Sequence, residues 1–163
     1  MKNVLVTGAA KRLGRAIVLD LAGAGWNVAL HYHGSAEDAE KTAAEARALG
    51  VTVATFKADL SQEEETAALV ARAGAGLGPL TALINSASLF EGDDWKSATR
   101  ESWDAHMQTN LRAPLLLSQH FALALPDGEG ILGGADAIVR DGFHDACLHC
   151  VMSCWRHSAT SLR

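Results

Sequence analysis

A glycine-rich turn near the N-terminus carries the residue types best suited to chemistry. Residues 7–14 read Thr-Gly-Ala-Ala-Lys-Arg-Leu-Gly, and Arg15 follows directly. Glycines let the main chain approach a phosphate, and the free amides at the start of a helix attract anions. The alternative is an ordinary strand-to-helix turn with a solvated basic face, but the flanking strand and helix patterns favour a phosphate site. Its predicted members are Gly8, Lys11, Arg12, Leu13 and Gly14.

A second polar segment bears on which dinucleotide such a turn would bind. Residues 31–35 read His-Tyr-His-Gly-Ser, and the first carboxylate after them is Glu37. Domains that bind NAD place an acidic residue about 20 residues after the glycines, where it binds the ribose 2′-hydroxyl. Hydroxyls, imidazoles and nearby cations favour a 2′-phosphate instead, so NADP(H) is expected rather than NAD(H). The predicted contacts are His31, Tyr32, His33 and Ser35; the alternative is that these are only polar residues at a strand end.

Alternating strands and helices must position these two segments. Four short apolar runs are typical of buried parallel strands, at residues 2–7, 27–32, 51–58 and 80–85. Helical patterns connect them, at residues 13–24, 35–49 and 61–78. We expect Ser35 to cap the second helix, and Ser61 with Glu64 to form a capping box on the third. The alternation predicts an α/β fold with a doubly wound parallel sheet.

The segment after residue 98 is helical and then strongly apolar. Thr99 begins a helical stretch through Asn110, and residues 111–125 form an apolar run interrupted by Pro114. The proline fits either a kink or a new helix start. Left uncovered, this run would expose a patch large enough to drive association. We therefore expect weak stability and a homo-oligomer, or other self-association, through residues 111–125.

Composition limits the class of protein. The chain has 163 residues, of which 48% are hydrophobic and 20% charged, and a formal net charge of −5. This acidic balance argues against nucleic acid or an anionic membrane as a partner. The sequence has no apolar run of about 18 residues, so no membrane-spanning helix is expected, and the start leaves no room for a signal peptide. The expectation is a cytoplasmic protein with a small-molecule substrate.

Residue usage changes near position 130. All three cysteines lie within residues 147–154, whereas the last lysine is Lys96 and the only tyrosine is Tyr32. The sequence therefore divides into residues 1–130 and a divergent tail, residues 131–163. Cysteines and histidines of the tail could ligate zinc, but structural zinc sites usually show two separated ligand pairs. No metal site is predicted, and a Cys/His metal-binding interaction module is kept as an alternative.

Together these motifs resemble the pteridine reductase branch of the short-chain dehydrogenase/reductase family. Arg12 stands where most members have a glycine, and Gly34 stands where the branch usually has a basic residue. The segment His31-Tyr32-His33 with Ser35 is similar to the branch. Further matches follow the third strand, the fourth strand and the next helix: Ala58-Asp59-Leu60, Asn85-Ser86-Ala87-Ser88, Phe90 and Asn110. The resemblance extends over residues 1–130.

The resemblance implies a Rossmann-type doubly wound parallel sheet, incomplete here, with about four to five strands and flanking helices. It implies NADP(H) as the cofactor and a pterin, or a related carbonyl or imine, as a substrate reduced by hydride transfer. Asn110 would take part in the proton relay of the family. The other residues implied are Asp59, Leu60, Asn85, Ser86 and Ala87 for the cofactor, and Ser88 and Phe90 for the substrate.

The family's Tyr-x-x-x-Lys pair, which passes a proton to the substrate and holds the nicotinamide ribose, has no counterpart in this sequence. Counting from Asn110, the pair should fall near positions 150 and 154, which are Cys150 and Cys154. We therefore expect a C-terminally truncated or frame-shifted chain with impaired turnover. The alternative is an inactive NADP-binding remnant.

Overall fold

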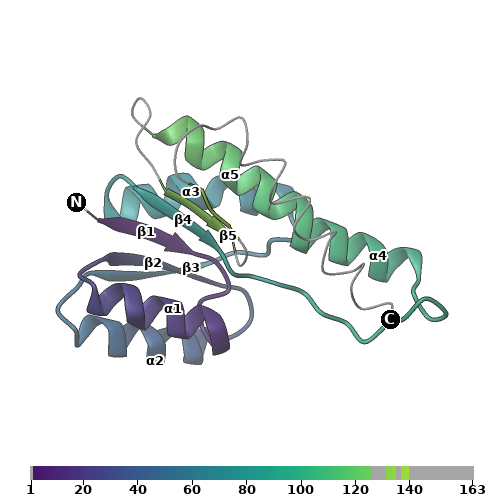
Figure 1. The fold of residues 1–163 in the computed structure, drawn as a ribbon, viewed down its shortest axis with the longest axis horizontal. Helices are drawn as coiled ribbons and strands as arrows, with labels where there is room; N and C mark the ends of the chain where they lie inside the picture. Colours follow the sequence, from purple (N-terminus) through teal and green to yellow (C-terminus); the bar gives the residue numbers. More distant parts are fainter. Residues whose placement is uncertain (1, 126–130, 135–136, 140–163) are drawn as a thin grey trace.

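The computed structural model describes residues 2–125, 131–134 and 137–139 (Figure 1). Its strands form one sheet in the order β3-β2-β1-β4-β5-β6. The strands are β1 (Asn3–Val6), β2 (Asn27–Tyr32), β3 (Val53–Lys57), β4 (Ala82–Asn85), β5 (Ile131–Gly134) and β6 (Ala137–Val139). All neighbouring pairs are parallel except β5 and β6, which are antiparallel. The predicted doubly wound α/β fold is confirmed, but the sheet has six strands where about four to five were expected. The two additional strands, β5 and β6, lie in the predicted tail, after the division at residue 130.

Helices cover both faces of this sheet. They are α1 (Arg12–Gly23), α2 (Ala36–Arg47), α3 (Glu63–Leu77), α4 (Arg100–Met107) and α5 (Ala113–Ala124), with a π-helical turn η1 (Gln108–Arg112) between the last two. Figure 1 shows α1 and α2 on one face, and α3 and α5 on the other. Among the described helices, none combines the length and the apolar character needed to cross a membrane.

The alternation of side chains along β1 connects the two cores. Val4 and Val6 are fully buried in the core beneath α1 and α2, whereas Leu5 is fully buried in the core beneath α3 and α5. Successive residues of a strand point to opposite faces, so a central strand with helices on both sides must be apolar throughout. This is why a short valine-rich run, rather than an alternating one, forms the centre of the sheet.

Of the two expected helix caps, the capping box at Ser61 is wrong, and Ser35 is right in position only. Ser61 and Glu64 form no capping box, because α3 begins two residues after Ser61, with Gln62 at its N-cap position. Ser35 does occupy the N-cap position of α2, but its side chain makes no capping hydrogen bond. Thr99 caps α4 in a reciprocal pair with Ser102. The start of a helix was thus easier to locate from the sequence than the bond that caps it.

Residues 111–125 are covered more completely than the sequence suggests. Pro114 lies at the start of α5, directly after the π-helical turn η1, and the helical path continues without a break from α4 to α5 (Figure 1). The proline, which has no N–H to donate, therefore coincides with a π-helical turn inside one helical path and not with a separate helix start. Leu117 and Phe121 are buried against α3 in the second core. Leu123 remains 85% exposed. The sequence predicted exposed apolar surface along the whole segment, but in the structure only one side of α5, which includes Leu123, is exposed.

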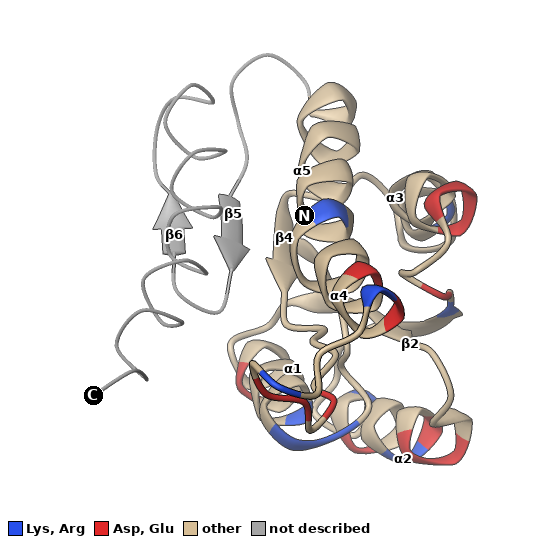
Figure 2. Ribbon diagram, turned by 90° about the vertical axis from the view of Figure 1, so that its right-hand side faces the viewer, with Lys and Arg blue, Asp and Glu red and all other residues tan. Residues whose placement is uncertain are grey.

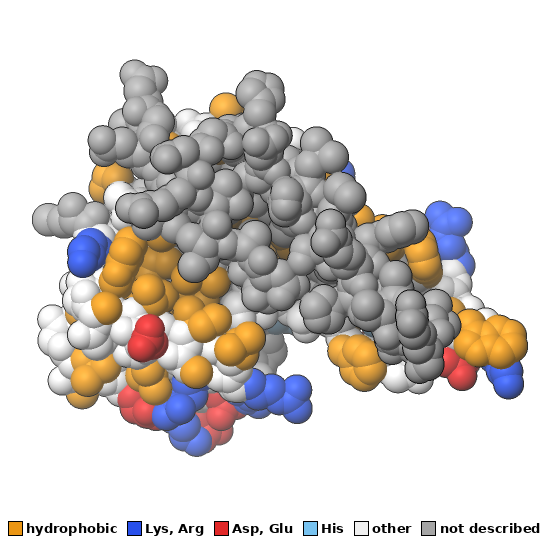
Figure 3. Space-filling view, viewed as in Figure 1, with side chains coloured by type: hydrophobic (Ala, Val, Ile, Leu, Met, Phe, Trp, Pro, Cys, Tyr) orange, Lys and Arg blue, Asp and Glu red, His pale blue; other side chains and the backbone are white. Residues whose placement is uncertain are grey.

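Exposed aromatic side chains lie instead before and within α4. Phe90, Trp95 and Trp103 are 88%, 84% and 61% exposed. Figure 3 shows hydrophobic side chains at the end of the molecule where Figure 1 places α4 and the loop that precedes it. This loop follows β4 directly, so its position matters for any site at that strand's end.

Candidate functional site

The predicted site segments follow the carboxyl ends of four neighbouring strands. Residues 7–14 follow β1, residues 33–35 follow β2, residues 58–60 follow β3, and residues 86–88 follow β4. Since all four strands are parallel, their carboxyl ends lie at the same edge of the sheet. The strand order reverses between β1 and β4, and open α/β sheets bind ligands outside the strands at such a reversal.

Two glycines give the turn after β1 a surface made of backbone. Gly8 has a φ of +62°, and a Cβ built there would lie 2.6 Å from the Cα of Ala87. A Cβ on Gly14 would lie 2.2 Å from the carbonyl oxygen of Gly8. Only glycine fits at either position. The turn can therefore present its amides closely to a ligand, as a phosphate site requires.

The start of α1 supplies amide donors beside this turn. The first backbone bond back to the helix start runs from Arg15 to the carbonyl of Lys11, at 3.1 Å. The amides of Arg12, Leu13 and Gly14 precede it and have no carbonyl partner within the helix. A twelve-residue helix such as α1 also carries partial positive charge at this end. Geometry and charge together suit an anion.

The role predicted for His31 is corrected by its burial. The ring is 2% exposed; its Nδ1 accepts a hydrogen bond from the Gly8 amide, and its Nε2 donates to the carbonyl of Ala58, each at 3.1 Å. Burial lowers the pKa of His31 to about 4, so the ring is neutral at pH 7. His31 has no free ring nitrogen for a cofactor. It fixes the turn after β1 to the segment after β3.

Thr7 performs a similar function between β1 and β4, and it was not among the predicted site residues. Its side chain is buried, and its Oγ1 accepts hydrogen bonds from the amides of Ser86 and Ala87, both at 3.0 Å. The threonine precedes the glycine turn directly, but its partners lie about 80 residues further along the chain. No pattern in the sequence indicates this contact.

The segment after β3 brings Asp59 to the same edge. The amide of Ser61 donates to Oδ1 of Asp59 at 2.9 Å. Hydrogen bonds from the side chain and the amide of Ser61, with His33 nearby, lower the pKa of Asp59. The Nε2 of His33 lies 3.7 Å from Oδ2 of Asp59. Glu65 accepts the Asp59 amide at 2.7 Å. An ionised acceptor beside an exposed imidazole suits the polar edge of an adenine and its ribose.

Three further predicted residues of this region differ in exposure. Leu60 is 5% exposed and belongs to the core under α3, so its side chain is not a cofactor contact and only its backbone could serve. Tyr32 is half-buried against the core under α1 and α2. Leu13 is 60% exposed at the start of α1.

The cations of the turn are partly neutralised by α2. Lys11 Nζ lies 2.8 Å from Oδ2 of Asp38, and Arg15 pairs with Glu45. Arg12 has a φ of 49° and forms no ion pair within the described part of the chain. Figure 2 shows Lys and Arg positions beside Asp and Glu positions over α1 and α2. The basic turn inferred from the sequence is therefore a mixed-charge surface.

Asn110 lies in η1 and holds the loop after β4. Its Oδ1 accepts from the amide of Leu89 at 2.7 Å, and its Nδ2 donates to the carbonyl of Leu89 at 2.8 Å. Ser88 and Phe90, on either side of Leu89, are exposed. Asn85, at the end of β4, is 8% exposed, and its Oδ1 has no hydrogen-bond partner among the described residues. A buried acceptor without a partner at the end of a central strand marks where a ligand donor could bind.

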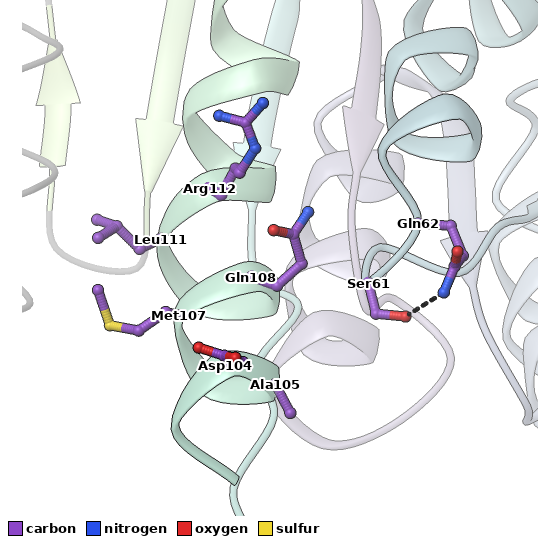
Figure 4. A pocket seen from close by; sticks show the side chains of 8 residues that line it. All are labelled: Ser61, Gln62, Asp104, Ala105, Met107, Gln108, Leu111 and Arg112. Atoms are coloured by element: carbon purple, nitrogen blue, oxygen red, sulfur yellow. Dashed lines mark hydrogen bonds between the residues drawn. The ribbon is translucent and has the colours of Figure 1, made fainter. Parts of the chain in front are cut away.

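A separate groove of about 620 Å³ lies between the start of α3 and the helical segment α4-η1 (Figure 4). Its lining contains none of the predicted site residues. It consists of Ser61, Gln62, Asp104, Ala105, Met107, Gln108, Leu111 and Arg112.

Metal binding finds no support in the described residues, where no cluster of three or more histidine, cysteine, aspartate or glutamate side chains could hold an ion. The Cys/His segment considered from the sequence, with Cys150 and Cys154, lies outside the described residues.

The sheet order, the glycine turn and the first amides of α1, which have no carbonyl partner within the helix, define a dinucleotide-binding Rossmann domain. The profile of the short chain dehydrogenase family matches residues 2–131. The chain therefore belongs to the short chain dehydrogenase family.

Individual relatives agree with this assignment. A 3-oxoacyl-(acyl-carrier-protein) reductase of Staphylococcus aureus is 35% identical over 111 residues, covering 68% of this chain and 45% of the relative. The short chain dehydrogenase/reductase nsrJ of Aspergillus novofumigatus is 33% identical over 131 residues, covering 80% and 50%. The crystal structure of FolM alternative dihydrofolate reductase 1 from Brucella suis, in complex with NADP, superposes with a TM-score of 0.77 at 31% identity, covering 99% and 70%. The chain spans about half the length of the relatives it matches by sequence.

Proposed function

We propose that this chain binds NADP(H) at the carboxyl edge of β1–β4. The observation that carries the proposal is the backbone cradle at Gly8 and Gly14, which any Cβ would fill, next to the free amides of α1. The pyrophosphate would lie on those amides, and Asp59 with His33 would hold the adenosine end. Asn85, whose buried Oδ1 has no partner among the described residues, would face the nicotinamide end. The residues present therefore fit the cofactor.

The proposed reaction class is reduction of a pterin, or of a related carbonyl or imine. When bound, the reduced nicotinamide supplies a hydride. The chain's own residues contribute positioning: Thr7 fixes the segment after β4 against the turn, and Asn110 fixes Leu89 between Ser88 and Phe90. The exposed ring of Phe90 offers an aromatic face on which a flat heterocycle can stack.

The similarity to a dihydrofolate reductase supports a pterin, since dihydrofolate contains a pterin ring. The similarity to a 3-oxoacyl reductase supports a ketone carried on a thioester as the second candidate. Both substrates accept a hydride at a polarised C=N or C=O bond, so the two candidates differ in the substrate contacts rather than in the cofactor site.

The residues that would deliver a proton to the product are missing from this chain. The only tyrosine of the chain is Tyr32, which packs against the core under α1 and α2, and the last lysine is Lys96. The chain therefore contains no Tyr-x-x-x-Lys pair to protonate a product oxygen or nitrogen. We propose that this chain binds the cofactor but reduces substrates very slowly.

An NADPH titration with a parallel activity assay tests both statements. Saturable binding of NADPH, with little oxidation in the presence of dihydrofolate or an acetoacetyl thioester, is the expected result. Rapid oxidation with either substrate would refute the expectation on turnover and would choose between the two substrates. Absence of saturable NADPH binding by the folded chain would refute the proposed function itself.

The expected homo-oligomer remains a proposal. Leu123 on α5, together with Trp95 and Trp103 near α4, leaves apolar surface exposed that a second copy could cover.

A further inference from the structure

We propose that Asp38 controls how strongly this site prefers a 2′-phosphate, because its carboxylate competes with that phosphate for the ammonium of Lys11. The inference rests on the proposed NADP(H) binding and concerns the specificity of the same site. It assigns a specificity-determining role to a residue of α2 that lies beyond the segment 31–35.

The placement of Asp38 supports this role. Lys11 precedes α1 directly in the glycine turn, and Asp38 lies in the first turn of α2, three residues after Ser35. The turn after β1 and the segment after β2 are the two parts of a Rossmann domain that surround the adenosine ribose. The pair Lys11–Asp38, at 2.8 Å, joins these two parts.

Charge makes the competition specific. The hydrogen bond from Lys11 lowers the pKa of Asp38, so the carboxylate is ionised at neutral pH. Of the three cations in the turn and the first turn of α1, Lys11 and Arg15 already face carboxylates of α2. A 2′-phosphate must therefore share Lys11 with Asp38, whereas a ribose 2′-hydroxyl can donate a hydrogen bond to a carboxylate. Compared with the same site without this carboxylate, Asp38 thus lowers the affinity for NADP(H) and favours NAD(H).

The pair is also accessible to a ligand. The side chains of Lys11 and Asp38 are 55% and 40% exposed, so their mutual attraction is partly screened by water and can be exchanged for a stronger partner. A phosphate carries more charge than a carboxylate. The cofactor can therefore recruit Lys11, but at the cost of leaving Asp38 beside a second anion.

The test compares Asp38→Asn with Glu37→Gln, by fluorescence titration of NADPH and NADH on the full chain. The control removes the same unit charge from the neighbouring residue of the same helix turn, but Glu37 pairs with Lys41 rather than with Lys11. For Asp38→Asn, the ratio of NADPH to NADH affinity should rise by about three- to tenfold, the effect of removing one charge beside a phosphate near the protein surface. For Glu37→Gln it should change by less than about twofold.

Salt provides a second measurement. The difference between the wild-type chain and Asp38→Asn should shrink as ionic strength rises, because exposed charges are screened. A second variant, Asp38→Ser, should behave like Asp38→Asn and replaces it if that protein does not fold. An unchanged affinity ratio in both Asp38 variants, or an equal rise in Glu37→Gln, would overturn the inference while leaving NADP(H) binding intact. If the folded wild-type chain binds neither dinucleotide, the proposed function fails, and the inference fails with it.

Discussion

The two sides of the carboxyl edge are built in different ways. On the cofactor side, the turn after β1 is fixed by buried side chains: His31 from β2 and Thr7 at the end of β1. On the side proposed for the substrate, the loop after β4 carries exposed aromatic residues and is held at Leu89 by Asn110 and at Glu91 by His106. A site that always binds the same large cofactor can be rigid. A substrate site can change its residues more readily when those residues contribute little to the stability of the fold. Substitutions should therefore destabilise the first side and leave the folding of the second almost unchanged.

Gly14→Ala should have the largest effect. The added methyl would meet backbone atoms of Gly8 and Ala9 at 2.2 and 2.9 Å, which no side-chain rotation can relieve. We expect a loss of about 4 kcal/mol in the free energy of unfolding, at the upper end for overpacking, and loss of NADPH binding. Urea unfolding measures the first quantity. Gly23→Ala, at the other end of α1 with open space around it, is the matched control and should not be destabilised.

Lowering the pH should weaken the cofactor side through His31. Its pKa is 6.5 in the unfolded chain and about 4 in the folded protein because of burial. Between these values the unfolded chain takes up a proton that the folded protein does not. The contribution of neutral His31 to the free energy of unfolding is therefore fully present above pH 6.5, and it falls by about 3 kcal/mol as the pH drops to 4.

The variant His31→Gln isolates this contribution. Glutamine does not titrate, so its unfolding free energy should lack the part of the pH dependence that His31 causes, although the variant is less stable at pH 7. Carboxylates with lowered pKa values, such as Asp38 and Asp59, also lose their contribution as the pH falls, but they do so in both proteins, so the difference between the two pH profiles reports on His31. Parallel pH profiles for the two proteins would show that His31 does not have the assigned role.

Thr7→Val should have an intermediate effect. The substitution keeps the shape of the side chain but removes the acceptor for the amides of Ser86 and Ala87. We expect a loss of about 2 kcal/mol, the order of cost for buried donors left without a partner. Thr7→Ser retains the oxygen and should lose much less. Equal losses in both variants would indicate that packing of the methyl group, and not the hydroxyl, joins β1 to the segment after β4.

The same contrast explains what the sequence could reveal. Apolar periodicity located β1–β4 and the helices, because burial on both faces imposes it on each strand separately. The glycines themselves indicated the turn after β1, where only glycine fits at positions 8 and 14. The sequence could not show that the ring of His31 points inward or that Asp38 reaches Lys11. These two contacts depend on how α2, β2 and the turn after β1 pack together. The capping box expected from the sequence at Ser61 was wrong, because α3 starts later and Glu65 accepts a hydrogen bond from the Asp59 amide.

Phe90→Ala should have the smallest effect on folding and the most selective effect on binding. The ring is 88% exposed, so its removal should change the free energy of unfolding by less than about 0.5 kcal/mol and leave NADPH affinity unchanged. If Phe90 stacks on a pterin, however, the affinity for dihydrofolate in the presence of NADPH should fall by about threefold or more. Phe90→Trp keeps an aromatic face and should retain most of that affinity. A loss of stability or of NADPH binding in Phe90→Ala would show that the loop after β4 bears structural load, and the contrast between the two sides would fail there.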